Sequence, residues 1–297
     1  MYRADDENGL APGRQGNRSA RSMLFTILAD FVYPHPDPVW TSTLLDVMEK
    51  GGFTEHAARQ AIARAAADGW MTSERRGRAT RWRPGEALKP MFEEGARRVF
   101  GIGEGAPPWD GRWLIVVMSI PHARRTVRKK LYAALRWAGL GNPAAGLWLT
   151  PHTDRVDEVK RVIDAVELQE STVSFIGEPA AVGLSVPEVV RRAWDLEGVA
   201  ASYEEVLARF AAFDPAPGDP VLLAHLDLTD ALRHFPFMDP QLPEALLPDW
   251  IGREATIRLQ QLRAASFDAA HARWLEIVAS TAPRDAGSRT VAQAAPG

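Results

Sequence analysis

The segment TEHAARQAIARAAADGWMTSERRGRATRWR, residues 54–83, decides how the first domain of this chain folds. Thr54 is a good N-cap, and alanine recurs behind it along one side of a helix that a Gly-Trp turn closes. Two short polar runs, 71–74 and 79–82, then predict the strands of a hairpin with Gly77 at its tip. A helix followed by a basic hairpin is the layout of a winged helix-turn-helix.

Two more helices are expected before this segment. The first begins at Ser19, since apolar residues recur at helical spacing after it. These residues are Met23, Leu24, Ile27, Leu28 and Phe31. The second follows Thr41 or Ser42 and stops at Gly51-Gly52, because glycine ends helices readily. With a further helix from Ala87, they complete an expected winged-helix domain over residues 19–101.

Nucleic-acid binding is the first hypothesis for this domain. Residues 50–83 contain eight Lys or Arg and three acidic residues, whereas residues 215–280 contain five Arg and nine acidic residues. Arginine donates bidentately to guanine, glutamine pairs with adenine, and hairpin arginines suit phosphates or the minor groove. The candidate DNA-binding residues are Thr54, His56, Arg59, Gln60 and Arg64 on the helix and Arg75, Arg76, Arg78 and Arg81 on the hairpin. The alternative is an arginine-rich surface that only solvent contacts.

Length and composition exclude several classes of protein. A chain of 297 residues is long for one domain, so two or three are expected. It has no cysteine, which removes disulfides, cysteine nucleophiles and thiolate metal sites. The net charge of −3 does not make the whole chain a binder of polyanions. No apolar run has the length of a bilayer, so we expect a cytoplasmic protein with no membrane partner.

The middle of the chain predicts a small α/β domain over residues 109–178. A Gly/Pro run at 101–108 separates it from the first domain. We interpret that run as a linker and not as a dinucleotide-binding loop, because it follows a helix and precedes prolines. Three strands alternate with two helices beyond it, an order compatible with a ferredoxin-like sandwich.

The remainder is expected to be helical over residues 187–280, with Gly198 ending one helix and Ser202 beginning the next. The proline-spaced loop at 236–250 is more typical of a structural clasp than of a site. Residues 1–18 and 281–297 are polar and without apolar period, so we expect them to be disordered. The expected fold class is therefore α+β with several domains: a winged helix-turn-helix, a central ferredoxin-like domain and a C-terminal helical domain.

Candidates for ligand binding lie beyond the first domain. A basic cluster near the start of the first helix of the central domain can hold a phosphate-bearing ligand, and tryptophans can stack on an aryl or adenine ring. The candidate residues are Arg124, Arg128, Lys129, Trp113, Trp148 and His234. The alternatives are a solvated basic face and tryptophans that pack the core. No catalytic constellation, metal site or cofactor motif is recognisable.

The order of several short motifs resembles that of the phenylacetic-acid-catabolism repressors, the PaaX-type regulators, over about residues 19–280. The residues that carry the resemblance are Arg21–Thr26 with Asp30, Ala58–Ala61 with Asp68–Trp70, Pro108–Trp113, Leu135–Gly141, Gly146–Trp148, Arg192–Leu196, Phe235–Phe237, Asp239–Pro243, Leu246–Trp250 and Gly252–Ala255. Each motif alone is modest, but their order together is specific.

The resemblance implies a dimeric bacterial repressor of a catabolic operon. Such a protein binds a palindromic operator as a homodimer, and a small effector releases it. In the best-known members the effector is an aryl-CoA thioester such as phenylacetyl-CoA. The resemblance also implies a central domain similar to the Cas2 nuclease fold, without an implied nuclease activity.

Three functions therefore enter the comparison with the structure. The first is a ligand-responsive repressor that binds double-stranded operator DNA and an aromatic compound or its CoA ester. The second is a metal-dependent nuclease built on the central domain, although Asp110 alone does not make a metal site there. The third is an RNA-binding regulator, since basic hairpins also fit RNA.

Overall fold

The computed structural model describes residues 19–33, 35, 37–100, 108–120, 125–180 and 182–283. It divides into two compact units. The N-terminal unit contains the described residues of 19–93, 215–227 and 264–283, and the central unit contains those of 94–214 and 228–263. Residues 101–107 of the expected linker, the expected disordered segment 1–18 and residues 284–297 of the expected disordered tail 281–297 lie outside the described residues. Thr281, also expected to be disordered, is the last residue of helix α11 (Ile251–Thr281).

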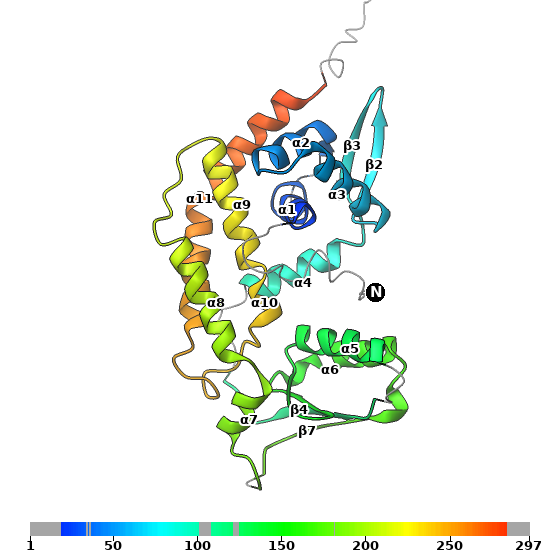
Figure 1. Cartoon of the computed structure of the whole chain (residues 1–297), viewed down its shortest axis with the longest axis vertical. Coiled ribbons are helices and arrows are strands. Elements are labelled where there is room, and N and C mark those ends of the chain that lie inside the picture. Colours follow the sequence, from blue (N-terminus) through cyan, green and yellow to red (C-terminus); the bar gives the residue numbers. More distant parts are fainter. Residues whose placement is uncertain are drawn as a thin grey trace, which may run out of the picture. The chain divides into compact units, whose positions relative to one another are not determined.

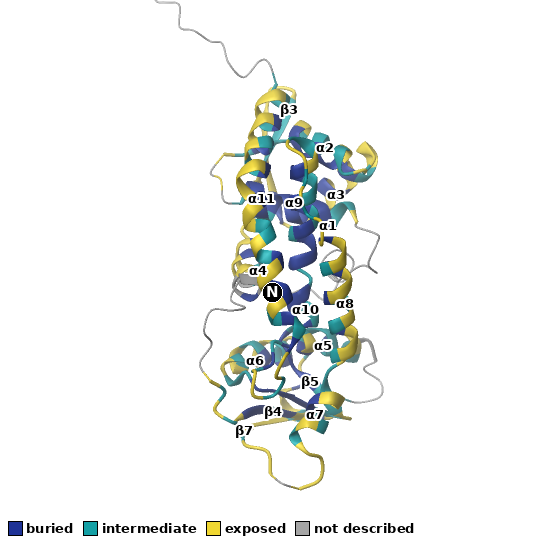
Figure 2. Cartoon of the chain, turned by 90° about the vertical axis from the view of Figure 1, so that its left-hand side faces the viewer, coloured by how far each residue is buried: buried dark blue, intermediate teal, exposed yellow. Residues whose placement is uncertain are grey.

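Helices α1 (Ala20–Ile27), α2 (Thr41–Lys50) and α3 (Glu55–Ala67) gather in the N-terminal unit (Figure 1). Ser19 caps α1, since its hydroxyl accepts a hydrogen bond from the Ser22 amide at 3.0 Å. The apolar residues that predicted this helix are all buried, and the helix continues as a π-helical turn, Leu28–Val32. Figure 2 shows α1 as a buried element.

A three-stranded antiparallel sheet completes this part of the unit, in the order β1-β3-β2. Strand β1 (Val39–Trp40) pairs with β3 (Ala79–Pro84), which pairs with β2 (Met71–Arg76). The predicted hairpin strands are present and each is two residues longer than expected. Helix α4 (Lys89–Phe100) follows β3.

The central unit is built on a four-stranded antiparallel sheet in the order β5-β6-β4-β7. The strands are β4 (Trp113–Met118), β5 (Gly141–Ala144), β6 (Leu147–Thr150) and β7 (Thr172–Gly177). Helices α5 (Arg125–Trp137) and α6 (Val156–Ala165) cover one face (Figure 1), and short 3-10 turns occupy Thr153–Arg155 and Gln169–Ser171. On that face Leu114 and Val116 pack with Trp148 in the core.

The sequence predicted three strands here and missed β5. This strand contains Asn142-Pro143 and lies at an edge of the sheet, where proline is tolerated because its missing N–H costs no ladder bond. Its composition therefore gave no strand signal.

The remaining helices are α7 (Val186–Ala193), α8 (Leu196–Arg209), α9 (Asp219–Leu232), α10 (Phe235–Met238) and α11 (Ile251–Thr281). The expectation that Gly198 ends a helix and Ser202 begins one was wrong. Asp195 caps α8 by accepting from the Gly198 amide at 3.1 Å, and Ser202 lies inside the helix, where its hydroxyl bonds to the Gly198 carbonyl. The Asp195 side chain caps the helix at its N-terminus, so α8 begins before Gly198 and continues through it.

The proline-spaced loop is a clasp around one buried carboxylate, as predicted. Asp239 accepts hydrogen bonds from the Tyr203 hydroxyl at 2.9 Å, the Trp250 indole at 2.8 Å and the Gln241 amide at 2.7 Å. Burial, followed by the Asp239 charge, raises the pKa of the Tyr203 phenol. The Tyr203 ring also stacks on Phe235 at 3.8 Å between centroids, so the clasp joins α8, α10 and the start of α11 within the central unit.

Candidate nucleic-acid interface

Helix α3 separates a buried side of small residues from an exposed polar side. Ala58, Ala61, Ile62 and Ala65 are buried, and such small side chains let the helix lie close to α1 and α2. The Thr54 hydroxyl accepts from the Ala57 amide at 3.2 Å, which confirms the predicted N-cap. The candidate residues His56, Arg59, Gln60 and Arg64 are all exposed.

Two pairs, each four residues apart, orient the exposed side of α3. Arg59 donates to the Glu55 carboxylate at 2.7 Å, and the Gln60 amide lies 2.9 Å from the His56 ring nitrogen. Pairs at this spacing stabilise a helix modestly. Arg59 and Gln60 lie within the first two turns of α3, the part of a helix that reads base edges in a major groove. The residue that the sequence analysis missed is Glu55, which its spacing from Arg59 could have indicated.

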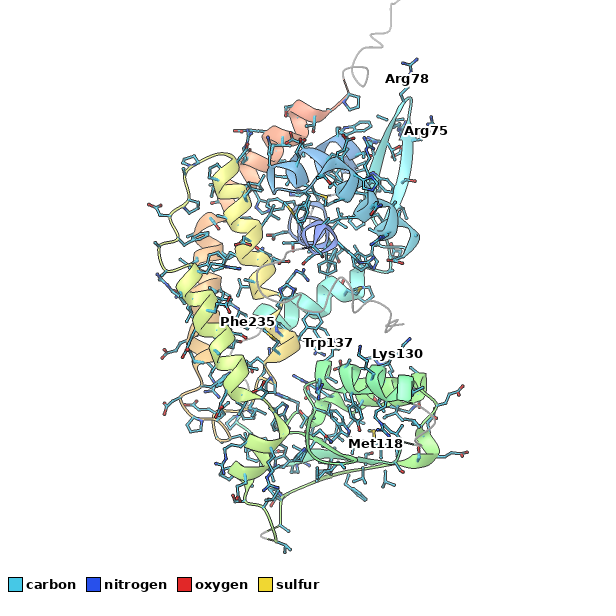
Figure 3. All side chains as sticks on the ribbon, viewed as in Figure 1. Arg75, Arg78, Met118, Lys130, Trp137 and Phe235 are labelled. Carbon is cyan, nitrogen blue, oxygen red and sulfur yellow. The ribbon has the colours of Figure 1, made fainter. Side chains whose placement is uncertain are left out.

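The hairpin carries a second basic group. Gly77 has a φ of +62° in a two-residue turn between Arg76 and Ala79, a conformation that glycine adopts without strain. Figure 3 shows Arg75 and Arg78 projecting from the tip, and the Arg75 side chain donates to the Gly77 carbonyl at 3.3 Å. Both side chains are exposed, so the tip presents positive charge to solvent.

A carboxylate divides the hairpin arginines into two kinds. Glu74 pairs with Arg76 at 2.6 Å and with Arg81 at 2.8 Å, and Arg81 also lies over the Trp40 ring at 5.2 Å. Desolvation acts to raise the pKa of Glu74, but the bonds and charges of Arg81 and Arg76 hold it below its usual value. Arg76 and Arg81 are therefore partly neutralised, in contrast to the tip arginines.

Polar contacts fix the helix and hairpin to their neighbours. The Trp82 indole donates to the Thr41 hydroxyl at 2.8 Å, which in turn donates to the Thr80 carbonyl at 3.1 Å. Arg21 bonds to Asp68 at 2.7 Å, and its guanidinium lies 3.9 Å from the Trp70 ring centroid. These contacts hold the start of α2 against β3 and the end of α3 against α1. The exposed side of α3 and the hairpin are therefore fixed to the other elements of the domain.

Buried hydrogen bonds connect the π-helical turn after α1 with residues from far along the chain in the same unit. His225 is fully buried and lies 2.8 Å from the Asp30 carboxylate and 2.8 Å from the Ser266 hydroxyl. The order Asp-His-Ser is that of a hydrolase triad, but Ser266 is only 5% exposed and therefore out of reach of a substrate. The group is a structural connection between the start and the end of the chain.

Three family models match the chain in sequence order. The model described as PaaX-like protein matches residues 19–86, the PaaX protein central Cas2-like domain matches 106–190, and the PaaX-like protein C-terminal domain matches 194–276. This chain belongs to the PaaX family. The resemblance that the sequence motifs indicated is thereby confirmed.

Two relatives can be compared with this PaaX-family protein along most of its length. It is 23% identical over 248 residues to the Transcriptional repressor PaaX of Escherichia coli (strain K12), covering 80% of this chain and 77% of the relative. A solved structure, the Uncharacterized protein Rv0674 from Mycobacterium tuberculosis, matches with a TM-score of 0.55 at 20% identity, covering 89% of this chain and 98% of that one. The second likeness shows the fold alone.

The candidate ligand residues of this PaaX-family protein do not converge. Trp113 and Trp148 point to opposite faces of the central sheet, and both are buried, at 3% and 0% exposure. Trp148 packs against Tyr132, and Trp113 packs against Trp194 and Trp109, which favours the packing alternative. His234 begins α10.

The basic cluster is described only in part. Arg128 and Lys129 lie on α5, with Arg128 half-buried and Lys129 exposed, while Arg124 lies outside the described residues. A small apolar cavity of about 90 Å³ lies elsewhere in the unit, lined by Trp113, Ile115, Leu149, Pro179, Val186 and Val189. It is the size of a small apolar group and not of a CoA ester.

The metal-dependent alternative finds no support among the residues that the structure describes. No cluster of three or more His, Asp or Glu side chains there is arranged to hold a metal ion. Asp110 accepts from the Arg112 amide at 3.0 Å and from its guanidinium at 2.6 Å, and these bonds lower the pKa of its carboxyl. Within the same residues, no helix has the length and apolar character needed to span a membrane.

Proposed function

We propose that this chain is a ligand-responsive, DNA-binding transcriptional repressor of a catabolic operon for aromatic compounds. The observation that carries the proposal is the exposed polar side of α3 beside a hairpin with an arginine tip, in a chain of the PaaX family. The curated relative named a transcriptional repressor supports the same function.

The proposed DNA-binding element is a winged helix-turn-helix. Helix α2, the Gly51-Gly52 turn and α3 supply the two helices, and β2 with β3 supply the wing. In such an element the second helix enters the major groove while the wing contacts the backbone or the minor groove. Arg59, Gln60 and Arg64 are the proposed base readers, and Arg75 and Arg78 are the proposed phosphate contacts.

The proposed switch acts through a dimer on a palindromic operator. A small effector, an aromatic compound or its CoA ester, would favour a geometry in which the two recognition helices no longer match successive major grooves. It can do so only by binding the two states unequally. The β-α-β-β-α-β order of the central sheet supports the proposed ferredoxin-like assignment of residues 109–178, and the Arg124, Arg128 and Lys129 cluster remains the proposed contact for a phosphate-bearing effector.

The test is operator affinity at fixed salt. Replacing Arg59 and Arg64 together by alanine should weaken specific binding at least about 30-fold, since each of the two base contacts is worth roughly 1–3 kcal/mol. Binding to unrelated DNA should change much less. Arg161→Ala, which removes an exposed arginine from α6 of the central unit, is the matched control. Equal operator affinity for both variants and the unmodified chain would exclude α3 as the reader.

The same assay separates the other two functions. With Mg²⁺ or Mn²⁺ added, a repressor shifts the operator and leaves it whole, whereas a nuclease shortens it. Competition between duplex DNA and RNA of equal length then distinguishes a DNA-binding from an RNA-binding regulator.

A further inference from the structure

His56 and Gln60 form a hydrogen-bonded pair on the exposed side of α3. They are four residues apart, so they project from the same side of the helix on successive turns. The Gln60 amide nitrogen lies 2.9 Å from the Nε2 atom of His56, and both side chains are exposed. A pair of this kind adds little to the stability of a helix, so folding alone gives it a small role.

The atoms that meet in this contact decide where the His56 ring carries its proton. An amide nitrogen donates and does not accept, so Gln60 is the donor and Nε2 of His56 is the acceptor. The neutral ring therefore carries its proton on Nδ1. The free side chain of histidine mostly carries it on Nε2, so the contact selects the less common tautomer.

The same contact decides which way the Gln60 amide faces. One N–H group of the amide is used by His56, and the oxygen and the second N–H group remain for a base. Adenine matches this arrangement in the major groove, because its N6 amino group donates and its N7 atom accepts. Guanine presents two acceptors there, O6 and N7, so the amide oxygen would face an acceptor. An amide held in this orientation therefore distinguishes the two purines.

We infer that His56 is a positioning residue that makes Gln60 a reader of adenine. The inference rests on the proposed function, because it takes α3 as the helix that enters the major groove. Gln60 lies in the second turn of α3, within the part of a helix that reaches base edges. The charged residues beside the pair on α3, Glu55 and Arg59, bond to each other at 2.7 Å, so each already has a partner.

The first test needs no DNA. Nuclear magnetic resonance of the isotope-labelled ring nitrogens in the full chain should show His56 with its proton on Nδ1 at pH 8. Gln60→Ala should return the proton to Nε2, because the donor is gone. His35, an exposed histidine outside α3, is the internal control and should give the same signals in both chains. A proton on Nε2 of His56 in the unmodified chain would overturn the inference.

The second test measures base preference. A duplex library selected on the unmodified chain gives its preferred site, and the position that Gln60 reads is the one whose preference Gln60→Ala removes. At that position adenine should be favoured over guanine about 10-fold, as expected for one bidentate contact. His56→Ala should reduce the ratio to about 2-fold, because an unrestrained side chain must be ordered on binding.

His56→Lys separates positioning of the amide from stabilisation of the helix. Lysine has three donors and no acceptor, so it attracts the Gln60 oxygen and leaves the amide N–H groups outward. Guanine offers two acceptors to them, so the preference should change from adenine to guanine. Ala67→Lys, which adds the same charge to another exposed position of α3, is the matched control and should keep adenine. Adenine preference that is unchanged in His56→Ala and His56→Lys would overturn the inference.

Failure of this inference can be told apart from failure of the proposed function. A chain that selects one duplex site but shows no response to changes at His56 or Gln60 keeps the repressor and loses the proposed adenine reader. A chain that carries the Nδ1 proton on His56 but selects no duplex site overturns both.

Discussion

Glu74 sets how much positive charge the hairpin presents. Its carboxylate holds Arg76 and Arg81, while Arg75 and Arg78 extend from the tip. A surface ion pair is worth little for folding, so the main effect of this carboxylate is on the field that an approaching phosphate meets. The hairpin is therefore less basic than its five arginines suggest.

We expect Glu74→Gln to tighten DNA binding, because it releases Arg76 and Arg81 and removes one negative charge. Affinity at about 0.1 M salt should rise several-fold, and the slope of log affinity against log salt should steepen by about one for each arginine that gains a phosphate. Titrations at several salt concentrations measure both. Glu170→Gln, an exposed change in the central unit, is the control. An unchanged slope would show that Arg76 and Arg81 gain no phosphate contact when Glu74 no longer holds them.

His152 makes the central unit sensitive to acid. Its Nε2 lies 3.0 Å from the Pro240 carbonyl, and burial, followed by the Arg155 charge, lowers its pKa from 6.5 to about 4. A carbonyl only accepts, so Nε2 must carry a proton in the neutral ring. The unfolded chain protonates the neutral His152 ring more readily than the folded chain does. The contribution of His152 to stability is therefore full above pH 6.5 and is lost as the pH falls toward 4.

We expect the contribution of His152 to the free energy of unfolding to fall by at most about 3 kcal/mol between pH 6.5 and pH 4. His152→Gln retains a donor for the carbonyl but does not titrate, so its urea midpoint should fall less than that of the unmodified chain between pH 7 and pH 5. His56→Gln, at an exposed position on α3, should follow the unmodified chain. If His152→Gln follows it too, His152 is not the titrating group.

At the scale of elements, Thr54 combines two tasks in α3. Its hydroxyl caps the helix, and its position at the N-terminus brings it near the proposed DNA surface. Thr54→Asp should keep the cap and its stability, while adding a negative charge that weakens DNA binding. Thr54→Ala should cost about 1 kcal/mol of stability. Equal DNA affinity for Thr54→Asp and the unmodified chain at one salt concentration would place Thr54 away from the phosphates.

The elements also show where sequence reasoning succeeds. The α1 and α3 helices were predictable because their apolar period and caps agree, and the hairpin because a glycine stands at its tip. Strand β5 was not predictable, since Pro143 is an unfavourable residue for a strand. The start of α8 was not predictable either, because the Asp195 side chain caps the helix three residues before Gly198, the residue expected to end a helix. For the candidate site, the exposed residues could be found from the sequence. Glu55 could also have been found from its spacing to Arg59, whereas the pairing of Glu74 with Arg76 and Arg81 needed the register of the hairpin.

At the scale of the whole molecule, the N-terminal unit is discontinuous in sequence. Asp30 of the π-helical turn bonds to His225, which also contacts Ser266, and Thr43 bonds to Thr281 at 2.7 Å. Asp219 pairs with both Lys50 and Arg273, at 3.3 and 2.8 Å. Residues 215–227 and 264–283 are thus part of the unit that contains the proposed reader, a grouping that no local sequence pattern reveals because the partners are about 200 residues apart.

We therefore expect a fragment of residues 19–101 to be much less stable than the same residues in the full chain. Without the later segments, the Asp30 carboxylate loses its hydrogen bond to His225, and Phe31 loses its ring contacts with His271 and Trp274. A hydrogen bond to a carboxylate is worth roughly 1.5–3 kcal/mol, and exposure of the Phe31 side chain costs roughly a further 1.5–3 kcal/mol, together a large part of the stability of a small domain. Urea unfolding followed by circular dichroism measures the difference.

Asp30→Asn in the full chain is the matched variant, since it keeps a polar partner for His225 and should cost less than truncation. A fragment that unfolds cooperatively at the midpoint of the full chain would show that residues 19–101 form a self-sufficient domain, and that the buried Asp30–His225 contact contributes little to the reader.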